Sequence, residues 1–171
     1  MTKNGGSAMK RLICCMLITA LLIAAAAPAY AAVPTLGPKM ISYAKAALKC
    51  LAAGDYERVV TGLPFSGLSP SAEEWRSFAQ GAFTGLSGSS PQTKYAVAFW
   101  TGRAWRVCVP VSEPNSGGVD TLVLSSEDGS TFTGYGCTSW DAVRAAYQSA
   151  DYVAWDAEYS ASTSAIVEND E

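Results

Sequence analysis

The 171-residue sequence contains no histidine. This absence excludes Ser-His-Asp and Cys-His nucleophile arrangements, histidine-ligated metal hydrolases and histidine general bases. The sequence also lacks a P-loop, a Rossmann fingerprint, a G-x-S-x-G elbow, an EF-hand loop and a glycosylation sequon. Carboxylate, tyrosine or lysine chemistry is what remains for an enzyme, and the sequence predicts no cofactor and no metal.

The sequence has one long apolar run, residues 12–27, in which Thr19 is the one polar residue. The run follows Lys10 and Arg11 and precedes Pro28, Ala29 and Ala31. A basic head, an apolar run and small residues at a break are the three parts of a secretory signal. An uncleaved anchor is the alternative, but a membrane-spanning helix takes about twenty apolar residues. We therefore predict cleavage after Ala31 and no stable membrane anchor afterwards.

The rest of the chain has the length of one domain. We predict a signal peptide over 1–31, a single α+β domain over 32–159 and a disordered acidic tail over 160–171. The leader predicts a secreted or extracellular protein, acting outside a bacterial cell or at its envelope. Export also exposes the chain to an oxidising environment, in which disulfides form.

Positive charge is scarce. The 12 basic and 15 acidic residues give a net charge of −3, and loss of residues 1–31 removes three basic residues and no acidic ones. Phosphate contacts need clustered Lys and Arg, so nucleic acid and anionic membrane surfaces are not expected partners. A small molecule or another protein is the partner that the composition leaves open.

Three cysteines follow the predicted cleavage site: Cys50, Cys108 and Cys137. They allow three pairings with one odd thiol, and the sequence does not choose among them. We favour Cys108 with Cys137 because both fall in the strand-rich half. The alternative is that some or all are small buried apolar residues.

Hydrophobic periodicity predicts helices first and strands second. Gly54 predicts the end of the first helix, Asp55 predicts the cap of the second, and Ser71 with Glu74 predicts a capping box for the third. Thr138 or Ser139 is the expected cap of the last helix. The expected helices cover 38–53, 56–60, about 71–86 and a segment from 139 or 140 to about 152–155, and the expected strands cover 95–100, 105–111, 119–124 and 131–135. The fold class is α+β, with N-terminal helices packed on a curved antiparallel sheet of about four strands, plus a C-terminal helix.

The stretch from Ala47 to Val60 reads A-L-x-x-L-x-x-G-D-Y-E-x-V-V and joins two of the expected helices. With the sheet that follows, it resembles the NTF2-like (cystatin-like) superfamily over residues 38–137. That resemblance implies a cone-shaped cavity, which the helix after Cys137 could plug. Tetratricopeptide repeats share the Ala, Leu, Gly, Asp, Tyr pattern but recur about every 34 residues, and nothing here repeats.

Two functions of different classes follow. The first is a non-enzymatic domain that binds a small ligand or a protein, with Trp105, Tyr135 and Asp120 as a speculative pocket. The second is a small NTF2-like enzyme that uses Asp and Tyr acid-base chemistry in a cone-shaped pocket. Asp120 is its candidate because it alternates with Leu122 and Leu124 on an apolar strand. No residue is assigned a catalytic role.

Overall fold

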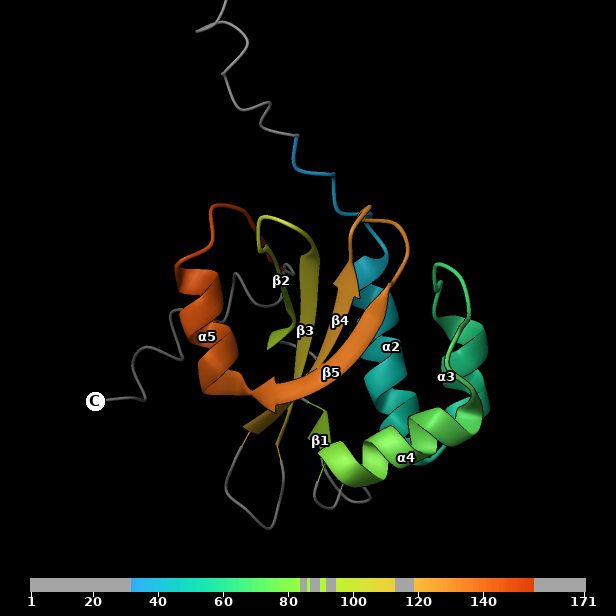
Figure 1. The fold of residues 1–171 in the computed structure, drawn as a ribbon. Coiled ribbons are helices and arrows are strands. Elements are labelled where there is room, and N and C mark those ends of the chain that lie inside the picture. Colours follow the sequence, from blue (N-terminus) through green and yellow to red (C-terminus); the bar gives the residue numbers. More distant parts are fainter. Residues whose placement is uncertain (1–31, 84–85, 87–89, 92–94, 113–118, 156–171) are drawn as a thin grey trace, which may run out of the picture. The chain divides into compact units, whose positions relative to one another are not determined.

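The computed structural model describes residues 32–83, 86, 90–91, 95–112 and 119–155. The predicted signal peptide, 1–31, and the predicted tail, 160–171, lie outside these ranges. Figure 1 shows the arrangement of the helices and strands.

Local signals in the sequence set the ends of the helices. The helices are α2 (Met40–Ala53), α3 (Tyr56–Gly62), α4 (Ala72–Ala82) and α5 (Trp140–Gln148). Gly54 ends α2 in the left-handed conformation, which glycine adopts without steric cost. Asp55 then caps α3 by accepting a hydrogen bond from the Arg58 backbone N–H. Ser71 and Glu74 form the predicted capping box at the start of α4.

The strands form one antiparallel sheet. They are β1 (Ser90–Pro91), β2 (Val97–Trp100), β3 (Trp105–Ser112), β4 (Val119–Ser126), β5 (Gly134–Ser139) and β6 (Val153–Trp155). Their order is β5-β4-β3-β2-β6, and β1 pairs with the far end of β3. The predicted α+β class is therefore confirmed, with two more strands in the described residues than expected.

The last strand replaces the end of a predicted helix. Helix α5 stops at Gln148, where the Ser149 hydroxyl donates to the carbonyls of Ala145 and Ala146. Val153 and Ala154 then face opposite sides of the sheet and join different hydrophobic clusters. The apolar spacing that suggests one long helix thus belongs to a short helix and a strand.

Helices cover both faces of the sheet (Figure 1). One face packs against α2, α3 and α4 around a core that includes Leu48, Trp75 and Leu122. The other face packs against α5, where Val143 meets Val97, Phe99 and Cys108. Because α5 lies on the opposite face, it does not plug the space between the early helices and the sheet.

The segment that precedes α2 is fixed to one end of the sheet. The indole N–H of Trp105 donates to the Pro34 carbonyl at 2.7 Å, and the Gly37 N–H donates to the Gly129 carbonyl at 2.7 Å. Gly129 belongs to the β4–β5 turn and has φ +74°. A Cβ at this position would lie 2.4 Å from the Thr35 carbonyl oxygen. Only glycine fits both the turn and this close approach.

Candidate binding site

The three residues of the speculative pocket lie on one face of the sheet, but Asp120 lies far along the strands from the other two. Trp105 pairs with Ser126, Tyr135 with Leu124, and Asp120 with Val111. At about 3.3 Å per residue, Trp105 and Asp120 are separated by roughly 20 Å and Tyr135 and Asp120 by roughly 13 Å along the strands. These side chains therefore do not line a common site.

The two aromatic residues of that set contribute to packing. The Tyr135 ring lies 4.3 Å from the Trp75 ring and 4.9 Å from the Phe78 ring, measured between centroids. Trp105 is 6% exposed and packs edge-on against Trp100. Asp120 is half-buried at the opposite end of the sheet. Aromatic clusters of this kind dominate core energetics, which accounts for both rings.

No disulfide joins the three cysteines in the described part of the chain. Cys108 lies on β3 and faces α5, whereas Cys137 lies on β5 and faces α4, with its sulfur 3.5 Å from the Ala82 carbonyl oxygen. Strand β4 runs between them, so their side chains project from opposite faces of the sheet. The favoured pairing is not formed because two Cβ vectors that point apart cannot be bridged.

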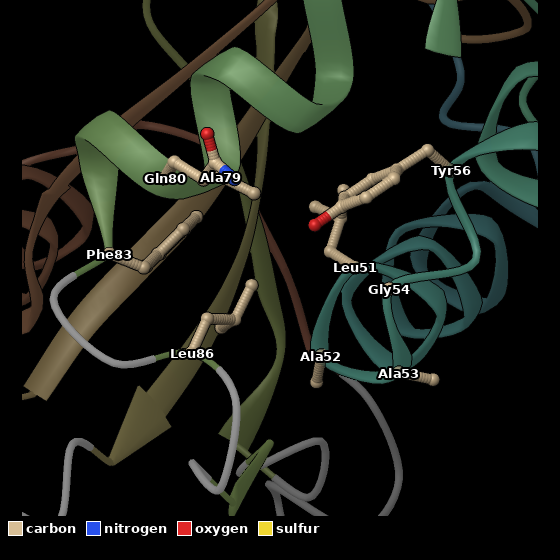
Figure 2. A pocket seen from close by; sticks show the side chains of 9 residues that line it. All are labelled: Leu51, Ala52, Ala53, Gly54, Tyr56, Ala79, Gln80, Phe83 and Leu86. Carbon is tan, nitrogen blue, oxygen red and sulfur yellow. The ribbon is translucent and has the colours of Figure 1, made fainter. Parts of the chain in front are cut away.

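A pocket opens where the C-terminal end of α2 meets α3 and α4 (Figure 2). It encloses about 420 Å³. Most of the lining side chains are small or apolar, and the two polar exceptions are Tyr56 and Gln80. The full lining consists of Leu51, Ala52, Ala53, Gly54, Tyr56, Ala79, Gln80, Phe83 and Leu86. Leu51, Ala79 and Phe83 are almost completely buried and form its apolar walls.

Tyr56 and Gln80 supply the polar side-chain groups of this pocket. In Figure 2 the Tyr56 hydroxyl points into the space between the helices, and the Gln80 amide lies on the α4 side. The guanidinium carbon of Arg76 lies 5.5 Å from the centre of the Tyr56 ring, and Arg76 also bonds Glu73 at 2.8 Å. A cation is attracted to the face of an aromatic ring, so Arg76 helps to hold the Tyr56 ring in place.

The sequence contains one signal that could have found this pocket. Ala52, Ala53 and Gly54 are three small residues in succession at the end of α2, and Ala79 is a small residue on the facing helix. Small residues on two facing helices leave a gap unless other side chains fill it. The apolar spacing of α4 by itself predicts core packing, and no motif in the sequence marks Tyr56 as a pocket residue.

Each shifted pKa among the described groups has a local structural cause. Hydrogen bonds from the Thr131 and Ser130 backbones hold the pKa of Asp128 well below its usual range. The capping box lowers the pKa of Glu74. Burial raises the pKa of Cys50, and it raises that of Cys108 to about 12. None of these four groups lines the pocket of Figure 2.

The described residues contain no cluster of three or more Cys, Asp or Glu that could hold a metal ion. In the same part of the chain, none of the helices has the length and apolar character needed to cross a bilayer. Comparison with protein-family models, with curated proteins and with solved structures gives no match.

Proposed function

We propose that this chain is a secreted, non-enzymatic binding domain that holds a small, neutral, amphipathic ligand in the pocket between α2, α3 and α4. The observation that carries the proposal is the lining of that pocket, which contains no charged side chain. Ligand pockets in proteins are typically apolar, enclose about 300–1,000 Å³ and carry a few polar groups that orient the ligand.

Tyr56 and Gln80 are the orienting groups in this proposal. The Tyr56 hydroxyl can donate or accept a hydrogen bond, and the Gln80 amide can do both. A neutral ligand with an apolar body and one polar atom satisfies these groups without burying an unpaired charge. The occupant is therefore a small neutral amphipathic molecule.

The secretory leader supports a location outside the cytoplasm, and the NTF2-like relationship is part of the same proposal. Three helices that precede an antiparallel sheet are the feature that supports this relationship. The enzyme alternative has weaker support, because Asp120 and Tyr135 are roughly 13 Å apart along the strands and general acid-base catalysis needs groups within hydrogen-bond reach.

A neutral fluorescent probe tests the proposal. N-phenyl-1-naphthylamine emits strongly only in apolar surroundings, and we expect it to bind the purified protein saturably at one site. Ala53 is exposed at the end of α2 and lines the pocket, so Ala53→Phe should narrow the entrance and weaken binding at least tenfold.

Ser42→Phe is the matched control. Ser42 is also exposed on α2 but does not line the pocket, and this variant should bind the probe as the wild type does. Circular dichroism of each variant checks that the fold is retained. Equal probe affinity in the two variants, or no saturable binding to the wild type, would overturn the assignment.

A further inference from the structure

A second hollow lies on the other face of the sheet, at the end where the β2–β3 and β4–β5 turns meet. It encloses about 580 Å³, and its lining, unlike that of the first pocket, includes charged side chains. The polar and charged lining residues are Arg103, Arg106, Ser125, Glu127 and Thr133, and Ala104 and Gly134 complete the lining. Arg106 pairs with Phe99 and Ser125 in the ladder and shares the α5 face with Cys108. This hollow and the pocket of Figure 2 therefore lie on opposite faces of the sheet.

Two arginines of this hollow have no carboxylate partner among the described residues. Arg76 and Arg144 pair with Glu73 and Asp141 at 2.8 and 3.9 Å, but neither Arg103 nor Arg106 forms an ion pair. The hollow carries two guanidinium groups and one carboxylate, so it has a local excess of positive charge in a chain whose net charge is −3. Such an excess attracts anions.

The two arginines are held differently. Arg106 is half-buried and donates a hydrogen bond from Nη1 to the Ser125 hydroxyl, which fixes the direction of its guanidinium group. Arg103 is exposed on the β2–β3 turn. A guanidinium group has five N–H donors in a planar fork, so Arg106 has further donors available for an oxyanion. A pre-oriented cation and an exposed cation together suit a carboxylate that enters from solvent.

The remaining lining residues suit hydroxyl groups next to that carboxylate. Glu127 lines the hollow without pairing with either arginine, so its carboxylate can accept hydrogen bonds from a ligand. Glu127 also repels a purely anionic ligand, which disfavours a phosphate or sulfate ion alone. Thr133 is exposed and adds a hydroxyl group.

Gly134 keeps the hollow open. A Cβ at this position would lie 4.0 Å from the nearest atoms of the Ser125 side chain, so no neighbour explains the absence of a side chain. The bare strand backbone leaves a flat surface on which a ring can lie.

From these residues we infer that the hollow binds a carboxylated sugar, with its carboxylate on Arg103 and Arg106 and its hydroxyl groups on Glu127 and Thr133. This site is independent of the pocket of Figure 2. It takes a charged ligand, whereas that pocket takes a neutral one. It would let the domain hold an acidic glycan unit while the other face carries an apolar ligand.

D-Glucuronate and D-glucose test the inference, because they differ in the carboxylate at C6. Isothermal titration of the purified protein should give saturable glucuronate binding, at least tenfold tighter than glucose binding and weakened by added NaCl. Arg103→Gln and Arg106→Gln should each lower glucuronate affinity at least fivefold. Because Arg103 is exposed, its variant keeps the test valid if Arg106→Gln does not fold.

Two further variants complete the design. Gly134→Leu fills the hollow without a change in charge and should also weaken glucuronate binding. Arg58→Gln removes an exposed arginine outside the hollow and should leave glucuronate binding unchanged. Equal affinity for glucose and glucuronate, wild-type affinity in both arginine variants, or binding of inorganic phosphate without binding of glucuronate would each overturn the inference. Naphthylamine binding should stay unchanged in Arg103→Gln, so failure at one site is distinguishable from failure at the other.

Discussion

Substitution of Gly129 by alanine should destabilise the fold more than substitution of Gly54 by alanine. Both glycines have a positive φ, but only Gly129 also lies close to another segment of the chain. Gly129 and Gly54 have nearly equal φ angles, +74° and +73°. A Cβ on Gly54 meets nothing within 4 Å, whereas a Cβ on Gly129 meets the Thr35 carbonyl oxygen at 2.4 Å. Alanine at the two positions therefore separates backbone strain from the steric clash.

The magnitudes follow from these contacts. Left-handed backbone costs an L-residue about 1–2 kcal/mol, and this is the whole cost expected for Gly54→Ala. In Gly129→Ala the 33–37 segment must also move, which breaks the Gly37–Gly129 hydrogen bond and strains the Trp105–Pro34 bond. Each such bond contributes about 0.5–1.5 kcal/mol, so the total loss is about 2–5 kcal/mol.

Thermal unfolding followed by circular dichroism measures the difference. One kcal/mol corresponds to roughly 3–5 °C in a domain of this size, so Gly129→Ala should melt at least 3 °C below Gly54→Ala. Gly62→Ala is the control, because Gly62 has neither a positive φ nor a neighbour near its Cβ. Equal melting temperatures for the Gly129 and Gly54 variants would show that the 33–37 segment is not held against the turn.

Three further predictions concern titration, thiol reactivity and processing. The depressed pKa of Asp128 means that its stabilising effect is present above the carboxyl's unfolded pKa of about 3.9 and is lost as the pH falls towards the folded value. Asp128→Asn should therefore melt below the wild type at pH 7, and the gap should shrink at pH 2; a constant gap contradicts this account. Because burial raises the pKa of Cys108 to about 12, iodoacetamide at pH 8 should label it in the native protein more slowly than Cys50, as peptide mass spectrometry can show. Faster labelling of Cys108 would mean that β3 is not covered by α5. Intact mass spectrometry of the exported protein should give a chain that begins at Ala32, and retention of residues 1–31 would refute the cleavage prediction.

The features that were predictable from sequence are those whose cause is local. The Asp55 cap, the Ser71–Glu74 box and the Gly54 stop depend on residues three or four positions apart, and all three lie where the pattern predicts them. The Ser139 cap of α5 is of the same kind. Such signals can be recognised in the sequence because the groups that form hydrogen bonds with the free backbone N–H and C=O groups at a helix end belong to the same short segment.

The features that were missed depend on which distant segments meet. Strand β6 exists because β2 offers it an unpaired edge, and nothing near Val153 in the sequence contains that information. The pocket of Figure 2 depends on how far α2 lies from α4. The register of β4 against its neighbours decides that Cys108 and Cys137 face apart and that Asp120 is far from Trp105. The alternation of apolar and polar residues in a strand shows which side chains share a face, but it does not show which residue of the neighbouring strand each one pairs with.

The pairing of β6 with β2 also affects how the chain can be made. Residues 153–155 are among the last of the described chain to leave the ribosome, and until then Val97, Ala98 and Phe99 lack their outer neighbour. An open strand edge is a template for association with other chains. A nascent chain that stays unfolded until residues 153–155 have been made avoids this hazard, whereas a chain truncated before Val153 would retain the unpaired edge of β2.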